Sequence, residues 1–238
     1  PVKNIDFAFE VKKVLSREMA EAITYSFFRQ KYFGLFASAE KSINLLNPIN
    51  AELSVMRDSL LPNLLEAVSF NEKKNYFNLQ LFEVGTVFYG AKPEEQKTNI
   101  AGVLAGKSAL QSFLNKEQDF TIWDAKQKML EVLNSIYGIS EVALSFKSLE
   151  NPNFHTKQSF AVYLGKNLIA ILGQIHPYTL EEFDLKQKVF AFEIFVASLP
   201  PFNPSKKKKI IYKEDILPDI QREIAIIVKR EVKFEDIL

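Results

Sequence analysis

The segment Ala101–Ser108 is the part of the sequence whose residues come nearest to a known chemical motif. It reads Ala-Gly-Val-Leu-Ala-Gly-Lys-Ser, a loose form of the loop that cradles nucleotide phosphates, with Lys107 as its cation. Such a loop follows a buried strand, but here the preceding residues are polar and the apolar run Ile100–Leu104 lies inside the motif. The order favours an ordinary strand, and an ATP-using enzyme that works through Lys107 is the alternative.

Glu83 and Glu193 are the next candidates, because each interrupts an apolar strand and paired carboxylates can act as general acid and base. The spacing of the two glutamates does not mark them as a catalytic pair. We therefore expect them to be exposed on alternate faces, or to have a partner such as a lysine on the next strand. His155 and His176 are assigned to turns or to the surface, because no serine lies in a nucleophile-elbow sequence.

Four consecutive lysines, Lys206, Lys207, Lys208 and Lys209, follow a proline-rich stretch at residues 200–204. The default interpretation is a solvated linker. Contact with RNA is the alternative, and its affinity would fall steeply with salt because lysines displace the counterions of phosphates.

Composition excludes several kinds of site. The 238 residues include no cysteine and two histidines, which excludes disulfides, thiolate metal sites, a cysteine nucleophile and a histidine-rich metal site. With 30 basic and 29 acidic residues, bulk charge does not indicate a nucleic-acid-binding protein. Arginine, the usual bidentate ligand of phosphate, is absent between Arg57 and Arg222. No apolar stretch is long enough to predict a membrane span, and both ends of the sequence suggest a fragment of a longer chain.

Hydrophobic periodicity predicts more strands than helices. Helices are expected at residues 7–19, 59–68 and 124–137, the last with Asp124 and Gln127 as a capping box and Gly138 at its end. Strands are expected at residues 21–28, 42–46, 79–89, 99–106, 142–146, 160–164, 168–175 and 190–196. These elements, joined by tight turns, predict an α+β fold with a mostly antiparallel sheet and flanking helices.

The helix at 59–68 carries the strongest signal, with Ser59 as its cap and Pro62 in its first turn. Its apolar arc is wide enough to serve both a core and a partner helix. We therefore treat five side chains of this arc as a hypothetical subunit interface: Leu60, Leu61, Leu64, Leu65 and Val68.

An ordered series of blocks resembles the C-terminal half of the β subunit of bacterial-type phenylalanyl-tRNA synthetases. The series spans nearly the whole chain, and the block Leu53–Pro62 is the most specific. The sequence departs from the family at residues 154–160, where a turn and its arginine are replaced, and at Glu18, where glycine is usual. The matching blocks are EAITYSF (21–27), NPI (47–49), ELSVMRDSLLP (52–62), LFEVGTVF (81–88), AGVLAG (101–106), GQIHP (173–177) and AFEI (191–194).

The resemblance implies a class II aminoacyl-tRNA synthetase-like module at residues 1–199, the proline- and lysine-rich linker at 200–213, and the truncated start of a ferredoxin-like anticodon-binding domain at 214–238. The family's β module is non-catalytic, and the α subunit attaches phenylalanine to its tRNA with ATP and Mg²⁺. Catalytic class II modules clamp ATP with two arginines, and the corresponding strands around Gly85 and Glu193 contain none. No cofactor is therefore expected in this part.

The resemblance also implies the partners: the α subunit in an α2β2 heterotetramer and phenylalanine tRNA, in the cytoplasm and away from membranes. Lys206, Lys207, Lys208, Lys209 and Arg222 are the expected tRNA contacts. The isolated chain is expected to expose an apolar patch and to self-associate. A stand-alone RNA-binding module that uses the lysine run is the rival interpretation.

Overall fold

The computed structural model describes residues 7–37, 42–48, 50, 52–109, 116–203 and 225. The chain divides into two compact units, Pro1–Lys207 and Lys208–Leu238. Every helix and strand assigned within the described ranges belongs to the first unit. The ferredoxin-like segment expected at 214–238, and most of the linker expected at 200–213, lie outside the described residues.

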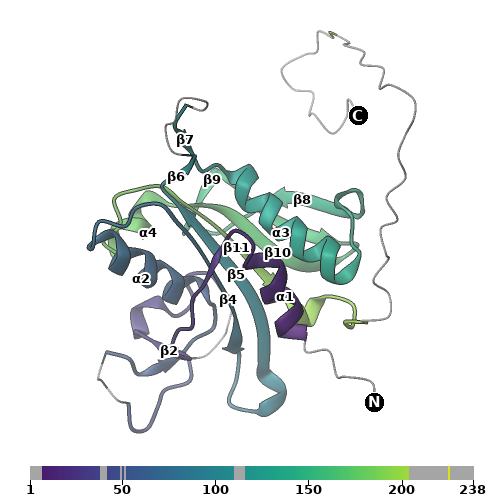
Figure 1. The fold of residues 1–238 in the computed structure, drawn as a ribbon. Helices are drawn as coiled ribbons and strands as arrows, with labels where there is room; N and C mark the ends of the chain where they lie inside the picture. The colour runs from purple at the N-terminus through teal and green to yellow at the C-terminus, as the bar shows by residue number, and fades with distance from the viewer. Residues whose placement is uncertain are drawn as a thin grey trace. The chain divides into compact units, whose positions relative to one another are not determined.

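A seven-stranded sheet forms the centre of the first unit (Figure 1). Its neighbouring strands pair antiparallel, except that β1 and β4 are parallel. The predicted α+β class with a mostly antiparallel sheet is therefore confirmed. In spatial order the strands are β1 (Ala20–Glu21), β4 (Leu79–Phe88), β5 (Gln96–Ala105), β11 (Val189–Phe195), β10 (Asn167–Ile175), β9 (Phe154–Leu164) and β8 (Leu144–Ser148).

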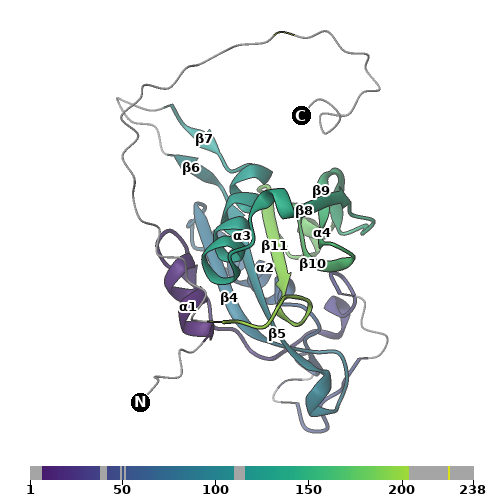
Figure 2. The same ribbon diagram turned by 90° about the vertical axis from the view of Figure 1, so that its right-hand side faces the viewer.

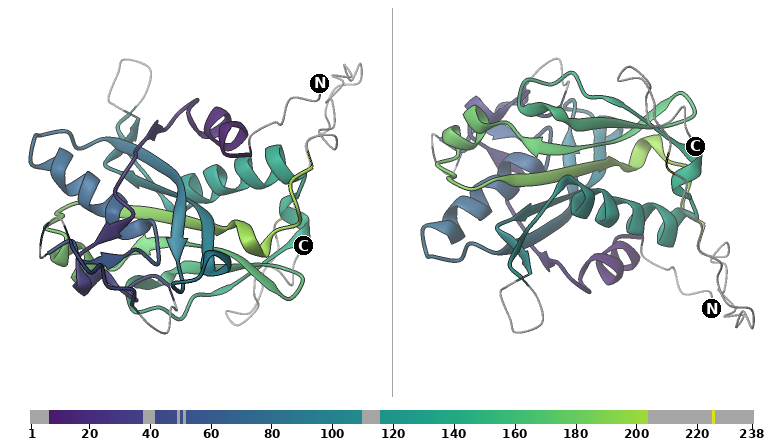
Figure 3. Two further views of the ribbon diagram at one scale, coloured as in Figure 1. Left: turned by 90° about the horizontal axis from the view of Figure 1, so that it is seen from below. Right: turned by 90° about the horizontal axis from the view of Figure 1, so that it is seen from above.

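Two helices, α1 (Phe7–Leu15) and α3 (Ile122–Tyr137), cover one face of this sheet and lie side by side (Figures 2 and 3). The stripe predicted for α3 is buried as expected, and it packs against aromatic rings of the sheet such as Phe82 and Phe192. This face has a core of apolar side chains, as helical and strand periodicity predict. The stripe consists of Ala125, Met129, Leu133 and Ile136.

The two ends of α3 agree with the sequence prediction to different degrees. Gly138 ends the helix with a φ of 67°, the left-handed conformation that glycine adopts without steric cost. At the other end the capping box consists of Thr121 and Asp124, because the helix begins at Ile122. The predicted box of Asp124 with Gln127 is therefore wrong by one turn.

The opposite face is covered by α2 (Leu61–Glu72), by α4 (Pro177–Glu182) and by the described part of the irregular segment 22–60. Strand β5 shows the alternation, since Ile100 and Leu104 lie in the α1–α3 core and Ala101 and Val103 lie in the core under α2. The irregular segment contains the short pair β2 (Phe27–Phe28) and β3 (Val55–Met56), and the 3-10 turn η1 (Gln30–Tyr32).

Several predicted boundaries need correction. Of the strand expected at 21–28, only its ends, in β1 and β2, pair with other strands, and the expected strand 42–46 is reduced to one bridge between Asn44 and Val55. The first helix ends at Leu15 and not at Met19. The N-cap position of α2 is Leu60, one residue after the predicted Ser59, although the Ser59 hydroxyl does accept from the first helical N–H, that of Leu61.

The long strands are close to expectation. The hairpin of β9 and β10 turns at Gly165, whose φ is 61°, although β9 begins six residues earlier than expected, at Phe154. The remaining short elements are β6 (Lys107–Ala109), β7 (Gln118–Asp119), η2 (Pro93–Glu95), η3 (Glu141–Ala143) and η4 (Val196–Ser198).

Candidate functional site

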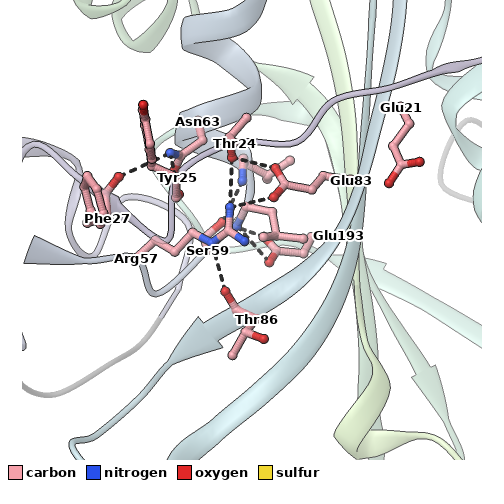
Figure 4. A network of polar contacts seen from close by, with 12 residues as sticks. Glu21, Thr24, Tyr25, Phe27, Arg57, Ser59, Asn63, Glu83, Thr86 and Glu193 are labelled. Atoms are coloured by element: carbon pink, nitrogen blue, oxygen red, sulfur yellow. Dashed lines mark hydrogen bonds and ion pairs between the residues drawn. The ribbon is translucent and has the colours of Figure 1, made fainter. Parts of the chain in front are cut away.

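Polar side chains are buried between the sheet and the irregular segment 22–60, in a network centred on Arg57 (Figure 4). Arg57 follows β3 and is only 2% exposed. Its Nη1 donates to Glu83 Oε1 at 2.8 Å and to Thr24 Oγ1 at 2.9 Å, and its Nε donates to the Thr86 carbonyl at 2.8 Å. Thr24 Oγ1 donates in turn to Glu83 Oε2 at 2.6 Å. One guanidinium and one hydroxyl therefore satisfy the buried Glu83 carboxylate.

The backbone and a glycine position this guanidinium. The N–H of Arg57 donates to the Ser26 carbonyl at 3.0 Å, and its carbonyl accepts from the N–H of Phe88, at the end of β4, at 2.9 Å. A Cβ atom on Gly85 would lie 2.4 Å from Arg57 Nη2. Arg57, in the most specific family block, and Gly85, in β4, are therefore packed tightly against each other.

Glu193, on β11, is the centre of a second buried cluster at the beginning of α2. Ser59 Oγ donates to its Oε2 at 2.5 Å, and the Leu60 N–H and Asn99 Nδ2 donate to its Oε1 at 3.2 and 2.8 Å. Ser59 Oγ also accepts from the Leu61 N–H at 3.1 Å. The carboxylate lies at a helix N-terminus, where the helix dipole favours negative charge.

Burial changes the acid–base properties of this cluster. It raises the pKa of Glu193, and the hydrogen bonds from Ser59, Asn99 and Leu60 oppose that rise. Burial, reinforced by the nearby Glu193 charge, raises the pKa of Tyr89 to about 12. The Tyr89 hydroxyl lies at the edge of the cluster, where it accepts from Asn99 Nδ2 at 3.5 Å.

Asp58, which stands between Arg57 and Ser59 in the sequence, is also buried. Its Oδ2 accepts from the Gly34 N–H at 2.9 Å, whereas its Oδ1 has no hydrogen-bond partner among the described residues. Burial raises the pKa of Asp58 to about 6, against the lowering effect of the Gly34 hydrogen bond. Arg57, Asp58 and Ser59 are therefore three consecutive polar residues that the fold removes from water.

The two glutamates do not form an acid–base pair, because no hydrogen bond joins them and each has its own partners. The expectation of exposure on alternate faces is wrong for both, whereas the alternative of a partner such as a lysine is right in that each has a partner, although neither partner is a lysine. Glu83 and Glu193 are buried, Glu83 pairs with an arginine, and Glu193 accepts from a serine, an asparagine and a backbone N–H.

The five side chains proposed as a subunit interface are fully buried within this chain. Each has 0% of its surface exposed and packs in the core between α2 and the sheet. They therefore have no apolar surface to offer another subunit, and their assignment as an interface is corrected to core: Leu60, Leu61, Leu64, Leu65 and Val68.

The segment 101–108 is a strand and a turn, as the order of its residues predicted. Gly102 lies inside β5, where a Cβ atom would meet the Phe192 ring at 2.5 Å. Lys107 follows the turn at Gly106, and its Nζ pairs with Asp119 at 2.7 Å and Glu117 at 3.4 Å. This lysine is neutralised by two carboxylates and follows no phosphate-binding loop, so an ATP-using enzyme that works through Lys107 is not supported.

His176 takes the turn position expected of it, whereas His155 lies near the beginning of strand β9 and is partly exposed. His155 Nδ1 accepts from the Lys157 N–H at 3.3 Å, and His176 caps α4 by accepting from the Tyr178 N–H at 3.3 Å. Residues 154–160, which depart from the family pattern, belong to the continuous strand β9. The expected tRNA contacts lie outside the described residues: Lys206, Lys207, Lys208, Lys209 and Arg222.

A groove of about 960 Å³ lies beside the Glu193 cluster and is lined in part by Tyr89 and Asn99. Its cations are Lys97 and Lys166, and no arginine lines it. The described residues contain no group of three or more histidine, aspartate or glutamate side chains that could hold a metal ion. Among the helices of the described ranges, none has the length and hydrophobicity needed to cross a membrane.

These residues do not fit a clamp for ATP. The buried Arg57 already donates to three oxygen atoms within the chain, and the strand that carries Glu193 contains no arginine. Sequence reasoning missed Arg57, Asp58, Thr24 and Asn99. The signal available was indirect: each glutamate within an apolar strand requires a buried donor, and Arg57 is the arginine of the most specific family block.

Comparison with known proteins gives a consistent result. A family model described as "Phenylalanyl tRNA synthetase beta chain CLM domain" matches residues 8–196. The β subunit of phenylalanine–tRNA ligase from Cereibacter sphaeroides is 32% identical over 214 residues, which cover 90% of this chain and 26% of that protein. The corresponding subunit from Photorhabdus laumondii is 32% identical over 236 residues, covering 96% of this chain and 29% of the relative. The chain thus spans less than a third of these relatives.

A similar fold occurs in a solved synthetase structure. The pyrrolysyl-tRNA synthetase of Desulfitobacterium hafniense superposes with a TM-score of 0.56 at 15% identity, covering 80% of this chain and 65% of that one. At this identity the likeness concerns the fold alone, and it agrees with the class II architecture that the resemblance implied.

Proposed function

The chain belongs to the phenylalanyl-tRNA synthetase β chain family, and we propose that it is a non-catalytic structural module of the β subunit of a phenylalanine–tRNA ligase. In this role it supports the assembly of subunits and the positioning of tRNA. The chemistry is left to another subunit.

The use of Arg57 is the observation that carries this proposal. A guanidinium that binds ATP must present its donors to a ligand, whereas Arg57 is buried and donates to Glu83, Thr24 and Thr86. Its function is therefore to hold the segment 22–60 against the sheet. A site that stabilises transferring phosphates needs such groups free and aimed at the substrate.

The remaining functional assignments follow from the family and are part of the proposal. The whole enzyme attaches phenylalanine to its tRNA with ATP and Mg²⁺, in the cytoplasm, and combines α and β subunits in an α2β2 heterotetramer. Residues 200–213 link this module to the start of an anticodon-binding domain at 214–238.

Two assays on the purified chain and on the α subunit encoded by the same genome test the proposal. We expect the chain to co-purify with tagged α subunit, and we expect the chain alone to give no phenylalanine-dependent exchange of pyrophosphate into ATP. Exchange by the chain alone would contradict its non-catalytic role. Failure to bind the α subunit would contradict its role in assembly.

The tRNA contact proposed for Lys206–Lys209 and Arg222 has its own test. Replacing the four lysines by glutamine should weaken tRNA binding by the assembled enzyme and reduce the steepness with which affinity falls as salt increases. An unchanged salt dependence would remove these lysines from the tRNA-binding surface.

A further inference from the structure

Aromatic and basic side chains gather on the surface where α2 ends. Phe70 is 59%, Tyr76 is 64% and Phe77 is 46% exposed, so three large rings face solvent within residues 70–77. Lys74 lies among them in the sequence, with its Nζ 4.1 Å from the centre of the Phe70 ring. Together with two exposed lysines that precede β11, these residues form what we call the aromatic–lysine patch: Phe70, Lys74, Tyr76, Phe77, Lys186 and Lys188.

Hydrogen bonds hold the backbone of this patch in one arrangement. The Lys74 N–H donates to the Asn71 carbonyl at 2.9 Å, and Asn75 takes the left-handed conformation, with a φ of 65°, just after the helix ends. Gln187 Nε2 donates to the Phe77 carbonyl at 3.0 Å, which places the lysines on either side of Gln187 beside this turn. The rings and the lysines are therefore presented on a fixed backbone, which loses little conformational freedom on binding.

The charges of the patch indicate what kind of ligand it fits. Its three lysines form no ion pair with a described residue. Asp184 and Asp119 lie near them, but these carboxylates pair with other lysines, Lys73 at 2.8 Å and Lys107 at 2.7 Å. Unpaired ammonium groups suit a polyanion, because lysines that neutralise phosphates release counterions. A protein partner fits less well, because lysine is depleted in protein interfaces.

We propose that the aromatic–lysine patch binds a single-stranded segment of RNA, with bases stacked on Tyr76 and Phe77 and phosphates facing the lysines. Exposed rings suit unpaired bases, because every base has a π-face, whereas duplex RNA is recognised by its shape and its sugar–phosphate backbone. This inference rests on the proposed function, in which the RNA is an unpaired part of the tRNA. A local patch of this kind is compatible with the balanced bulk charge of the chain.

Fluorescence anisotropy with a labelled oligouridylate of about 10 nucleotides tests the inference. The lysines at 206–209 are replaced by glutamine in every chain, so that they do not contribute. The test variant is Tyr76→Ala with Phe77→Ala. Trp123→Ala with Tyr178→Ala is the matched control, because Trp123 is 64% and Tyr178 is 74% exposed outside the patch. We expect the test variant to bind about 10- to 100-fold more weakly and the control to bind like the parent chain, with unchanged thermal unfolding of both.

A second pair of variants tests the charges of the patch. Replacing its three lysines by glutamine should reduce the steepness with which affinity falls as salt increases. The same replacement at three exposed lysines elsewhere, Lys92, Lys157 and Lys166, changes the net charge equally and should leave the salt dependence unchanged. Equal effects of the two triple variants would mean that RNA responds to overall charge, which would overturn the patch as a site.

The outcomes separate this inference from the proposed function. If the chain binds the α subunit but not the oligonucleotide, or if the aromatic variant binds RNA like its control, the patch is overturned while the role in assembly stands. If the chain binds the oligonucleotide through the patch but does not bind α, the role in assembly fails while the RNA site is supported. Equal affinity for duplex RNA would overturn base stacking. If sedimentation shows a dimer that the aromatic variant abolishes while RNA binding is unchanged, the patch joins two copies and its assignment to RNA is overturned.

Discussion

The two faces of the central sheet are buried by different means. Against α1 and α3 the sheet presents apolar side chains such as Phe82 and Phe192. On the opposite face the next residues of the same strands, Glu83 and Glu193, are buried with hydrogen-bond partners. The stability of the first face depends on how completely apolar side chains fill its core. The stability of the second face depends on whether each buried polar group keeps its hydrogen-bond partner.

The polar face also determines which way the segment 22–60 is turned. Thr24 reaches inward to Arg57 and Glu83, so the residues on either side of it must point outward. An apolar contact could tolerate a rotated or shifted segment, but a buried carboxylate requires its donors in fixed positions. The network thus accounts for two apolar side chains, Ile23 and Tyr25, lying exposed on this segment.

Removing Arg57 should have the largest effect on stability. Arg57→Met leaves the Glu83 carboxylate buried without its cation, and we expect the free energy of unfolding to fall by about 3–5 kcal/mol. Urea denaturation at pH 7 measures this change. The additional replacement Glu83→Leu should recover most of the loss, because it removes the unpaired charge.

A surface pair supplies the control for that effect. Lys12 and Glu21 are 2.6 Å apart, at least as close as Arg57 and Glu83 at 2.8 Å, but about a third of each side chain is exposed. Lys12→Met should therefore cost less than about 1 kcal/mol. Equal losses for Arg57→Met and Lys12→Met would show that the buried pair has no special importance.

The apolar face should respond to lost volume alone. Leu133→Ala in α3 removes a fully buried side chain, and we expect a loss of about 3 kcal/mol in the free energy of unfolding. Because Leu133 and Arg57 lie on opposite faces of the sheet, the two losses should add within about 0.5 kcal/mol in the double variant. Strong coupling between them would contradict the independence of the two faces.

The same contrast explains what could be predicted from the sequence. The α3 stripe, the β9–β10 hairpin and the long strands follow from periodicity and turn residues, and they lie where expected within a few residues. The segment 21–28 alternates in the same way, but it pairs with other strands only at its ends. Its inward side is set by the contact between Thr24 and Arg57, two residues that are far apart in the sequence. The family block around Arg57 marked the right place but gave no sign of its burial.

Low pH should stabilise the polar face through Asp58. Its folded pKa of about 6 is above the ordinary value of 3.8, so the folded state binds this proton more tightly than the unfolded chain. The contribution to stability is complete below about pH 4 and is lost as pH rises through 6, by about 3 kcal/mol in all. The raised pKa of Glu193 acts in the same direction.

Denaturation between pH 4.5 and 7.5 measures this dependence. Asp58→Asn should reduce the fall in stability across that range, and the fall that remains should come from Glu193. Asp184→Asn is the control, because Asp184 lies at the surface and Lys73 lowers its pKa, so this variant should retain the fall. A fall that persists unchanged in Asp58→Asn would show that Asp58 is not its source.

Two glycines, one packed against each face, allow the smallest and sharpest comparison. A Cβ atom at Gly85 would lie 2.4 Å from Arg57 Nη2, and one at Gly102 would lie 2.5 Å from the Phe192 ring. We expect Gly85→Ala and Gly102→Ala each to cost about 1–2 kcal/mol by overpacking. Repeating both in the Arg57→Met background separates the faces, because methionine lacks the guanidinium that Gly85 accommodates. Most of the Gly85→Ala penalty should then disappear and the Gly102→Ala penalty should remain, whereas equal penalties in both backgrounds would mean that Gly85 does not serve the polar network.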